Sequence, residues 1–385
     1  MAVNSQAIAR GWLAKELTGT NAGLGGVLLA FGLAMLIATP LGGVAADRLP
    51  KRALLVGSQS LLVLSSLWIG LAVQFDVVEY WMLMGASAIQ AVAFAVYGPT
   101  RMAFTAELVD NASLSNAIVL GQMGSEAMRI VGPTLAGVLI GAATWGLQVV
   151  FLSASVLCAI AVTMTFLLPP GRPPPGRPER SPFADLKDGL RYVRDRHDLR
   201  VLVFCSLTVV MIGYPYMAFM PTVAQGIFDR GSSGYGMLSA ASAVGAVIAG
   251  VFSARRGHRH DPWRFVAVSG FGFSAGLLVL GVTPTFGLAL IVLAFTGAMS
   301  LAFQSMLQTL LLDLSDFDYH GRIQSLVMLG FSGFGIAALP LGLLADAIGL
   351  RTTFVIMGTT VGTIMVLFVS ATRRVRAREL VLDLG

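Results

Sequence analysis

Residues 121–141 read GQMGSEAMRIVGPTLAGVLIG, an apolar stretch that is long enough to cross a bilayer and yet contains charged residues and a proline. Glu126 and Arg129 each cost about 3 kcal/mol at bilayer depth unless they face protein or water. Gly132 and Pro133 free a backbone carbonyl and bend the helix, which membranes tolerate only where neighbours satisfy the backbone. The segment is therefore predicted to be a functional helix inside a bundle rather than an inert anchor.

Similar apolar stretches recur along the whole chain. Of its 385 residues, 56% are hydrophobic and only 12% are charged, and the mean hydropathy is +0.78. Soluble domains carry about 25% charged residues, so this composition indicates a membrane protein with many spans. We expect complete spans at 21–46, 53–74, 79–105, 116–141, 147–168, 199–221, 233–253, 264–283, 286–312, 323–345 and 352–372.

The first residues have a different pattern. Residues 1–18, MAVNSQAIARGWLAKELT, look like the closing half of one further span. They lack the basic region, apolar core and cleavage site of a signal peptide. We expect either a truncated or misassigned start, or a protein with a shortened first helix.

Basic residues orient the chain. Most of the 26 Lys and Arg residues fall in predicted loops on one side of the membrane, as does the tail that contains Arg373, Arg374, Arg376 and Arg378. Because cytoplasmic loops are enriched in Lys and Arg, this side and the C-terminus are expected in the cytoplasm. The net charge of +6 is then a topology signal, and its spread over short loops argues against a nucleic-acid partner.

A proline-rich stretch divides the chain. Residues 169–182 read PPGRPPPGRPERSP, which predicts a stiff, extended spacer, and apolar residues at helical spacing follow it. We therefore expect an N-terminal transmembrane bundle at 1–168, a cytoplasmic linker with a short amphipathic helix at 169–198, and a C-terminal bundle with a basic tail at 199–385.

An ordered set of charges follows the span predicted at 21–46, which is the second span when the partial first one is counted. Residues 42–52 read GGVAADRLPKR. Asp47 is placed to face the N-terminus of the helix that begins near Gly321 and Arg322, where the helix dipole favours an anion. Such a contact would join the two halves at the inner face and close an inner gate. The alternative is that these charges only mark the topology.

This loop resembles the signature G-x-L-A-D-R-x-G-R-R of the major facilitator superfamily, with matches at Gly43, Asp47, Arg48 and Arg52 and departures at Ala45 and Pro50. Further resemblance, to the enterobactin-exporter-like and macrolide-efflux-like branch, lies in residues 6–20, 97–117, 129–141, 321–330 and 339–351. The resemblance implies an all-α membrane fold of two pseudo-symmetric six-helix bundles, with an incomplete first helix here. It also implies that Gly132, Pro133 and Gly137 form the helix bend of an antiporter motif.

Glu126 and Arg129 share one helix face because they are three residues apart. Burial and a nearby arginine act in opposite directions on the proton affinity of a carboxylate, so its titration can be tuned for proton coupling. The alternative is a permanent structural ion pair.

Candidate cargo contacts lie in other spans. Arg10 is deep enough to meet cargo or a carboxylate of the 116–141 helix, and a structural arginine is an equal alternative. In the second half, Tyr214 and Tyr216 are followed at a distance by Gln304 and Gln308. Aromatic walls with few charges suit amphipathic cargo, although side chains at such spacings more often serve packing.

The sequence thus favours a secondary transporter of the cell membrane that exports a small amphipathic compound, such as a drug or siderophore, in exchange for protons. The alternatives are an importer or uniporter of the same fold, and a non-transporting, truncated or degenerate membrane protein. No paired acid, base or nucleophile set, nucleotide-binding loop or metal-ligand spacing is present, so we predict no enzyme, cofactor or metal. The expected partners are the small molecule, protons and lipid, and we expect a monomer.

Overall fold

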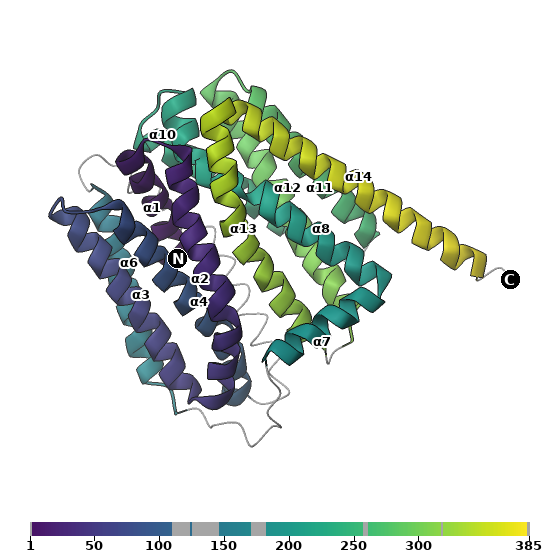
Figure 1. The fold of residues 1–385 in the computed structure, drawn as a ribbon, viewed down its shortest axis with the longest axis horizontal. Helices are drawn as coiled ribbons and strands as arrows, with labels where there is room; N and C mark the ends of the chain where they lie inside the picture. The colour runs from purple at the N-terminus through teal and green to yellow at the C-terminus, as the bar shows by residue number, and fades with distance from the viewer. Residues whose placement is uncertain are drawn as a thin grey trace. The chain divides into compact units, whose positions relative to one another are not determined.

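The computed structural model describes residues 2–109, 124, 146–170, 182–256, 261–316 and 319–382, which form helices and turns without a strand (Figure 1). Their helical elements are α1 (Ala2–Thr18), α2 (Asn21–Arg48), α3 (Lys51–Gln74), α4 (Tyr80–Leu108), α6 (Gly146–Phe166), α7 (Pro182–Asp195), α8 (His197–Gly213), η1 (Tyr214–Phe219), α9 (Met220–Thr222), η2 (Val223–Ile227), α10 (Ser232–Arg256), α11 (Pro262–Val282), α12 (Phe286–Asp313), α13 (His320–Ile348) and α14 (Leu350–Leu382).

Ten helical segments of the described part are long and apolar enough to cross a membrane. They coincide with the predicted spans that fall in this part, so these spans are confirmed. The span predicted at 199–221 continues further, to Ile227. The predicted span at 116–141 lies outside the described residues.

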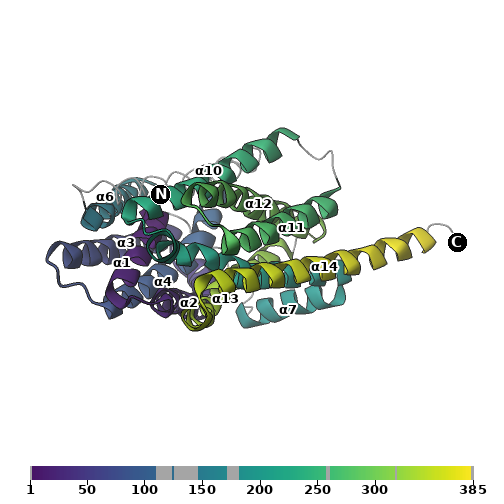
Figure 2. The same cartoon turned by 90° about the horizontal axis from the view of Figure 1, so that it is seen from above.

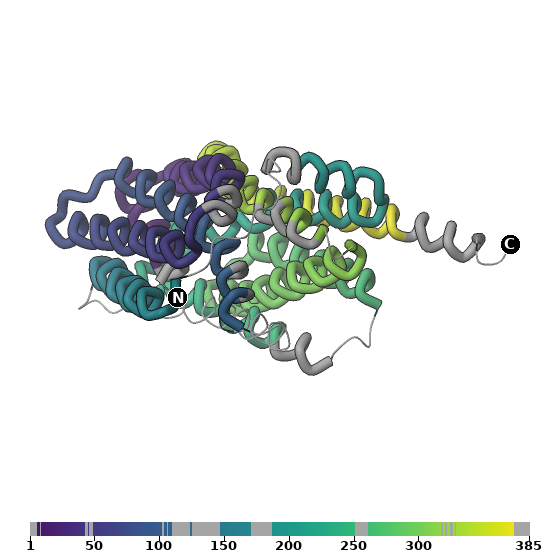
Figure 3. Tube along the Cα trace, turned by 90° about the horizontal axis from the view of Figure 1, so that it is seen from below, coloured from purple at the N-terminus to yellow at the C-terminus, as the bar shows by residue number. Residues whose placement is uncertain are grey.

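The chain forms two compact units, which we describe one at a time. Unit 1 consists of Met1–Phe183 and Ala218–Ala240. Within it, α2 packs along α4, α3 packs against both α4 and α6, and α1 packs on α6 (Figure 3). The face that each helix buries is rich in small and aliphatic side chains, such as Ala91 and Ala95 of α4 against Met35 and Ala38 of α2.

Unit 2 consists of Ala184–Met217 and Ala241–Gly385. Here α11 packs against α12 and α14, and α8 packs on α14 (Figure 2). The pairings repeat those of unit 1. The packing of α11 against α12 and α14 corresponds to that of α3 against α4 and α6, and the packing of α8 on α14 corresponds to that of α1 on α6. This repetition agrees with the predicted pair of pseudo-symmetric bundles.

Glycines allow close approach between helices in both units. A Cβ on Gly42 of α2 would lie 2.6 Å from the carbonyl oxygen of Ala95 in α4, and one on Gly297 of α12 would collide with the carbonyl of Ser242 in α10. In lipid, helices associate through tight packing rather than through the hydrophobic effect, so small residues stand where backbones meet.

The span from His197 to Ile227 is not a continuous α-helix. Its regular part, α8, ends at Gly213, and the 3-10 segment η1 follows with Pro215 inside it. The π segment η2 begins after Pro221. Each proline lacks an N–H for the helical ladder, which leaves carbonyls to be satisfied in other ways. The break contains two tyrosines, Tyr214 and Tyr216, within η1.

Candidate functional site

Unit 1 contains a buried polar group that we call the arginine cluster: Gln6, Arg10, Ser66, Ser87 and Gln90. Arg10 of α1 is only 3% exposed. Its guanidinium donates to Ser87 Oγ of α4 at 3.2 Å and to Gln90 Oε1 on the same helix. One turn earlier, Gln6 donates to Ser66 Oγ of α3 at 2.6 Å. Hydrogen bonds thus join this part of α1 to two helices, from Arg10 to α4 and from Gln6 to α3.

The partners of Arg10 are neutral. No ion pair joins Arg10 to an acidic side chain in the part of the chain that the structure describes. The nearby carboxylate of Glu16 instead accepts from Trp12 Nε1 at 2.7 Å. An uncompensated arginine at bilayer depth costs about 3 kcal/mol or more. The arginine cluster therefore holds a positive charge that its own hydrogen bonds do not neutralise.

Unit 2 contains a second group, the tyrosine cluster: Tyr214, Tyr216, Ser242, Phe273 and Gln304. The Tyr214 hydroxyl lies 3.0 Å from Gln304 Oε1 and also 3.0 Å from the carbonyl oxygen of Ser300. The Tyr216 hydroxyl shares a hydrogen bond of 3.1 Å with Ser242 Oγ. Both tyrosine rings contact Phe273, with centroids 5.5 and 5.8 Å apart. The structure thus joins Tyr214 to Gln304, two of the candidate residues.

Other candidates fall beside this cluster or were missed. Gln308 is half-buried on α12, one turn beyond Gln304. Ser66, Ser87 and Gln90 were missed, and the available signal was weak: Ser87 and Gln90 are two polar residues three apart in an apolar span, so they share a face. Ser242 carried no such signal, since serines are frequent in these spans.

Two basic residues of the 42–52 loop, Lys51 and Arg52, make contacts within unit 1. Lys51 is buried and forms an ion pair with Glu107 of α4. Arg52 donates to the carbonyl oxygen of Phe166 at the end of α6, and its guanidinium lies 5.6 Å from the Phe166 ring centroid. A cation at a helix C-terminus is favoured by the dipole. Arg52 therefore has a packing role within its own unit.

The remaining loop residues lie in the last turns of α2. The side chains of Asp47 and Arg48 are outside the described part, and so are the surroundings of Gly43. The inner-gate role of these three residues stays a prediction.

The helix expected near Gly321 and Arg322 does begin there, since α13 starts at His320. The Arg322 guanidinium lies 4.9 Å from the Tyr319 ring centroid and 4.0 Å from Asp188 of α7. A contact of this helix end with Asp47 therefore stays a prediction as well.

A set of side chains fastens α7 to the segment between α12 and α13. We call Tyr192, Arg196, Asp316 and Tyr319 the α7 clamp. Asp316 Oδ2 accepts from the Tyr192 hydroxyl at 2.9 Å and from Arg196 at 2.8 Å. The two tyrosine rings stack with centroids 3.8 Å apart. Burial raises the pKa of the Tyr192 phenol, which keeps its proton available for Asp316.

Five candidates lie outside the described residues: Glu126, Arg129, Gly132, Pro133 and Gly137. Proton coupling and the antiporter bend therefore stay predictions.

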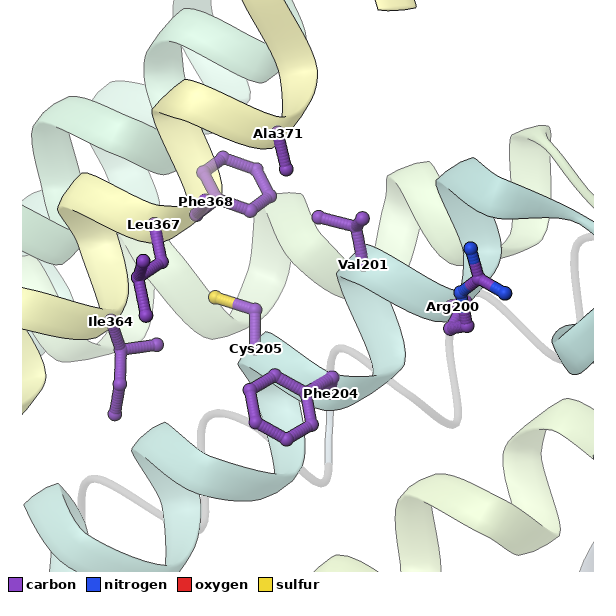
Figure 4. A pocket seen from close by; sticks show the side chains of 8 residues that line it. All are labelled: Arg200, Val201, Phe204, Cys205, Ile364, Leu367, Phe368 and Ala371. Carbon is purple, nitrogen blue, oxygen red and sulfur yellow. The ribbon is translucent and has the colours of Figure 1, made fainter. Parts of the chain in front are cut away.

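An apolar hollow of about 320 Å³ lies between α8 and α14 (Figure 4). The Cys205 thiol and the Phe368 ring line it, and Arg200 stands at one end. Phe204 and Leu367, which also line it, are 62% and 57% exposed. The hollow thus opens on the outer surface of unit 2, at a distance of about 13 Å along the helix from the tyrosine cluster. Its lining suits a lipid chain better than a polar cargo.

Comparison with curated proteins finds transporters along most of the chain. A "Staphyloferrin A transporter" of Staphylococcus aureus is 24% identical over 87% of this chain and 84% of its own length. A "Macrolide efflux protein A" of Streptococcus pyogenes is 23% identical over 84% and 80%. The "Enterobactin exporter EntS" of Citrobacter koseri is 26% identical over 73% and 66%.

Solved structures share the fold at lower identity. A bacterial homologue of the human lysosomal transporter Spinster, in an inward-facing and unoccupied conformation, superposes with a TM-score of 0.75 at 14% identity, over 97% of this chain and 95% of its own. A variant of the nucleoside transporter NupG gives 0.74 at 14% identity, over 96% of both chains. The family model described as "Major Facilitator Superfamily" matches residues 1–340. With this match over most of its length, a repeated bundle architecture and ten apolar helices in its described part, this multi-pass membrane protein belongs to the Major Facilitator Superfamily of small-molecule transporters.

Proposed function

We propose that this protein is a secondary transporter that exports a small amphipathic compound, such as a drug or siderophore, in exchange for protons. One observation carries the proposal. The relatives named for staphyloferrin A transport and for macrolide efflux match at least 80% of both chains, so the similarity includes both sequence halves. Structural neighbours of other transport classes support only the fold.

Amphipathic cargo is supported by the chemistry of the two clusters. The tyrosine cluster offers aromatic rings together with hydroxyl and amide groups, which suits a ligand that has both apolar and polar parts. The arginine cluster offers a charge held by neutral groups. Ligand sites in general obtain affinity from apolar contact and orientation from a few polar groups.

We assign proton coupling to Glu126 beside Arg129. Export against a gradient needs a group that gains and loses a proton as access alternates, and a carboxylate within a span is suited to that task. The bend expected at Gly132, Pro133 and Gly137 would lie directly after this pair. Both the proton-coupling pair and the bend are assigned from the sequence.

We place the protein in the cell membrane, as a monomer with a cytoplasmic C-terminus. The basic tail after Thr372 supports this orientation through the positive-inside rule. One chain contains both bundles, so a single copy supplies the whole fold.

The test is uptake of a labelled macrolide, erythromycin, and of staphyloferrin A, a compound with carboxylate groups, into inside-out membrane vesicles with and without an imposed pH gradient. Wild-type protein should accumulate one of these compounds only under the gradient. Glu126→Gln keeps the shape of the side chain and removes its titration, so it should lose uphill accumulation by at least about tenfold and retain downhill exchange.

Glu79→Gln, an exposed glutamate just before α4, is the matched control and should behave like the wild type. Uphill accumulation by Glu126→Gln at equal protein content would place coupling elsewhere. A wild type that moves cargo only downhill would be a uniporter, and equal loss of both activities with lower protein stability would identify Glu126 and Arg129 as a structural pair.

A further inference from the structure

We propose that the cargo carries a carboxylate and that the arginine cluster binds it. This inference rests on the proposed transport function and narrows it from amphipathic compounds in general to amphipathic anions. The juxtaposition that carries it is a buried guanidinium whose two acceptors, Ser87 and Gln90, are both neutral.

The guanidinium has capacity for a ligand. An arginine offers five N–H donors, and the hydrogen bonds to Ser87 and Gln90 use one donor on each terminal nitrogen. The remaining donors can form the paired hydrogen bonds that guanidinium groups make with carboxylates. A carboxylate would also supply the negative charge that the described surroundings of Arg10 lack.

The choice of acceptor argues against a purely structural arginine. Gln90 has almost the shape of a glutamate, and a glutamate there would neutralise the buried charge within the protein. If Arg10 only joined α1 to α4, a carboxylate acceptor would hold the two helices together more strongly than an amide does. A neutral amide keeps the side chain in position and leaves its charge available.

Arg10 is also held in a defined place. One turn before it, Gln6 is hydrogen-bonded to Ser66 of α3. Two residues after it, the buried Trp12 ring stacks on Tyr235 at a centroid distance of 5.8 Å. Because both flanks of this part of α1 are fastened, the guanidinium loses little freedom when a ligand binds, which favours affinity.

The test compares two fluorescent probes, 1-pyrenebutyrate and 1-pyrenebutanol, on the purified full-length protein in a neutral detergent without any gradient. The probes share a ring and a chain and differ in the carboxylate. Wild-type protein should bind pyrenebutyrate at least about tenfold more tightly, which corresponds to about 1.4 kcal/mol. Arg10→Gln should lose this preference, and Arg264→Gln, an exposed arginine of α11, should keep it.

Gln90→Glu keeps the test decisive if Arg10→Gln fails to fold. The new carboxylate should pair with Arg10, preserve or raise the melting temperature, and abolish the preference for pyrenebutyrate. Equal affinity of the wild type for the two probes, or binding of neither, would overturn the proposal, as would a preference that survives in Gln90→Glu. None of these results bears on proton coupling, which the vesicle experiment decides by itself. Uphill export of erythromycin, which has no carboxylate, would refute the present inference and leave the proposed transport function standing.

Discussion

At the scale of single residues, three cations of unit 1 are compensated in different ways. Lys51 is neutralised by Glu107, and Arg52 is satisfied by the backbone end of α6. Arg10 has hydrogen bonds and, among the described residues, no countercharge. The energetic cost of burial is lowest where a carboxylate or a helix dipole supplies the opposite charge. The residue that lacks such compensation is therefore the best candidate for contact with cargo.

The charge of Asp47 has a separate predicted role, at the inner gate. Asp47→Asn should leave the amount of protein in the membrane unchanged and reduce flux about two- to fivefold. This range corresponds to the roughly 0.3–1 kcal/mol that a helix N-terminus contributes to binding an anion. The measurement is the initial rate of cargo flux per amount of membrane protein.

Asp76→Asn is the control, because Asp76 lies in a turn after α3 with a φ of 59°, a left-handed conformation that asparagine also adopts. Wild-type flux in Asp47→Asn would reduce the 42–52 loop to a marker of topology.

At the scale of helices and segments, the linker helix shows what the sequence pattern reveals and what it leaves out. Apolar residues at helical spacing predict a helix after the prolines, and α7 is present at Pro182–Asp195. The α7 clamp has no sequence signature, because its partners Tyr192 and Asp316 are more than a hundred residues apart. Contacts of this kind arise only when the chain has folded.

Loss of the α7 clamp should release the linker helix. Asp316→Ala removes the acceptor shared by Tyr192 and Arg196, so trypsin should cleave after Arg191 and Arg194 several-fold faster in this variant than in the wild type. Exposed ion pairs contribute only about 0–1 kcal/mol each, and the melting temperature of the whole protein should therefore change little. The readout is the rate at which the intact chain disappears in limited proteolysis.

Asp195→Ala is the matched control, because Asp195 is an exposed residue of α7. Among the ion pairs described, its carboxylate contacts only the neighbouring Arg194, at 3.7 Å. Unchanged cleavage in Asp316→Ala would mean that the remaining contacts of α7, such as the tyrosine stack and the Arg322–Asp188 pair, hold it without Asp316.

At the scale of the whole molecule, residues 218–240 of the second sequence half pack within unit 1. The Trp12–Tyr235 stack is one contact of this packing, and a Cβ on the adjacent Gly11 would be 3.7 Å from the Tyr235 hydroxyl. In a transporter that alternates access, a contact between elements of the two sequence halves is a natural place for movement.

We therefore expect a covalent link at this contact to stop transport. Trp12→Cys and Tyr235→Cys would be combined with Cys158→Ala and Cys205→Ala, which remove the native thiols. A short bifunctional and reducible thiol reagent should abolish flux, and reduction of the link should restore it. Each single cysteine variant should be insensitive to the same treatment. Full flux in a completely linked protein would show that the contact persists throughout the cycle.

The sequence alone determined the class of this protein and the positions of the ten spans in its described part. Apolar length and the distribution of arginine and lysine need no tertiary information, because the bilayer imposes both. The interruption of the span at Tyr214–Ile227 was not predicted, although Pro215 and Pro221 were its visible cause. A proline permits several local geometries, and packing selects one of them.

Only the tertiary structure decided which polar residues meet. Arg10 was a candidate from the sequence, but its partners Ser87 and Gln90 were not. Tyr214 and Gln304 are separated by a chain length that no spacing rule connects. Helices in lipid show weak amphipathic patterns, because apolar side chains cover both the packed and the lipid-facing sides. The sequence therefore reports that a helix crosses the membrane, whereas the direction in which its polar side chains point follows from the packing of the bundle.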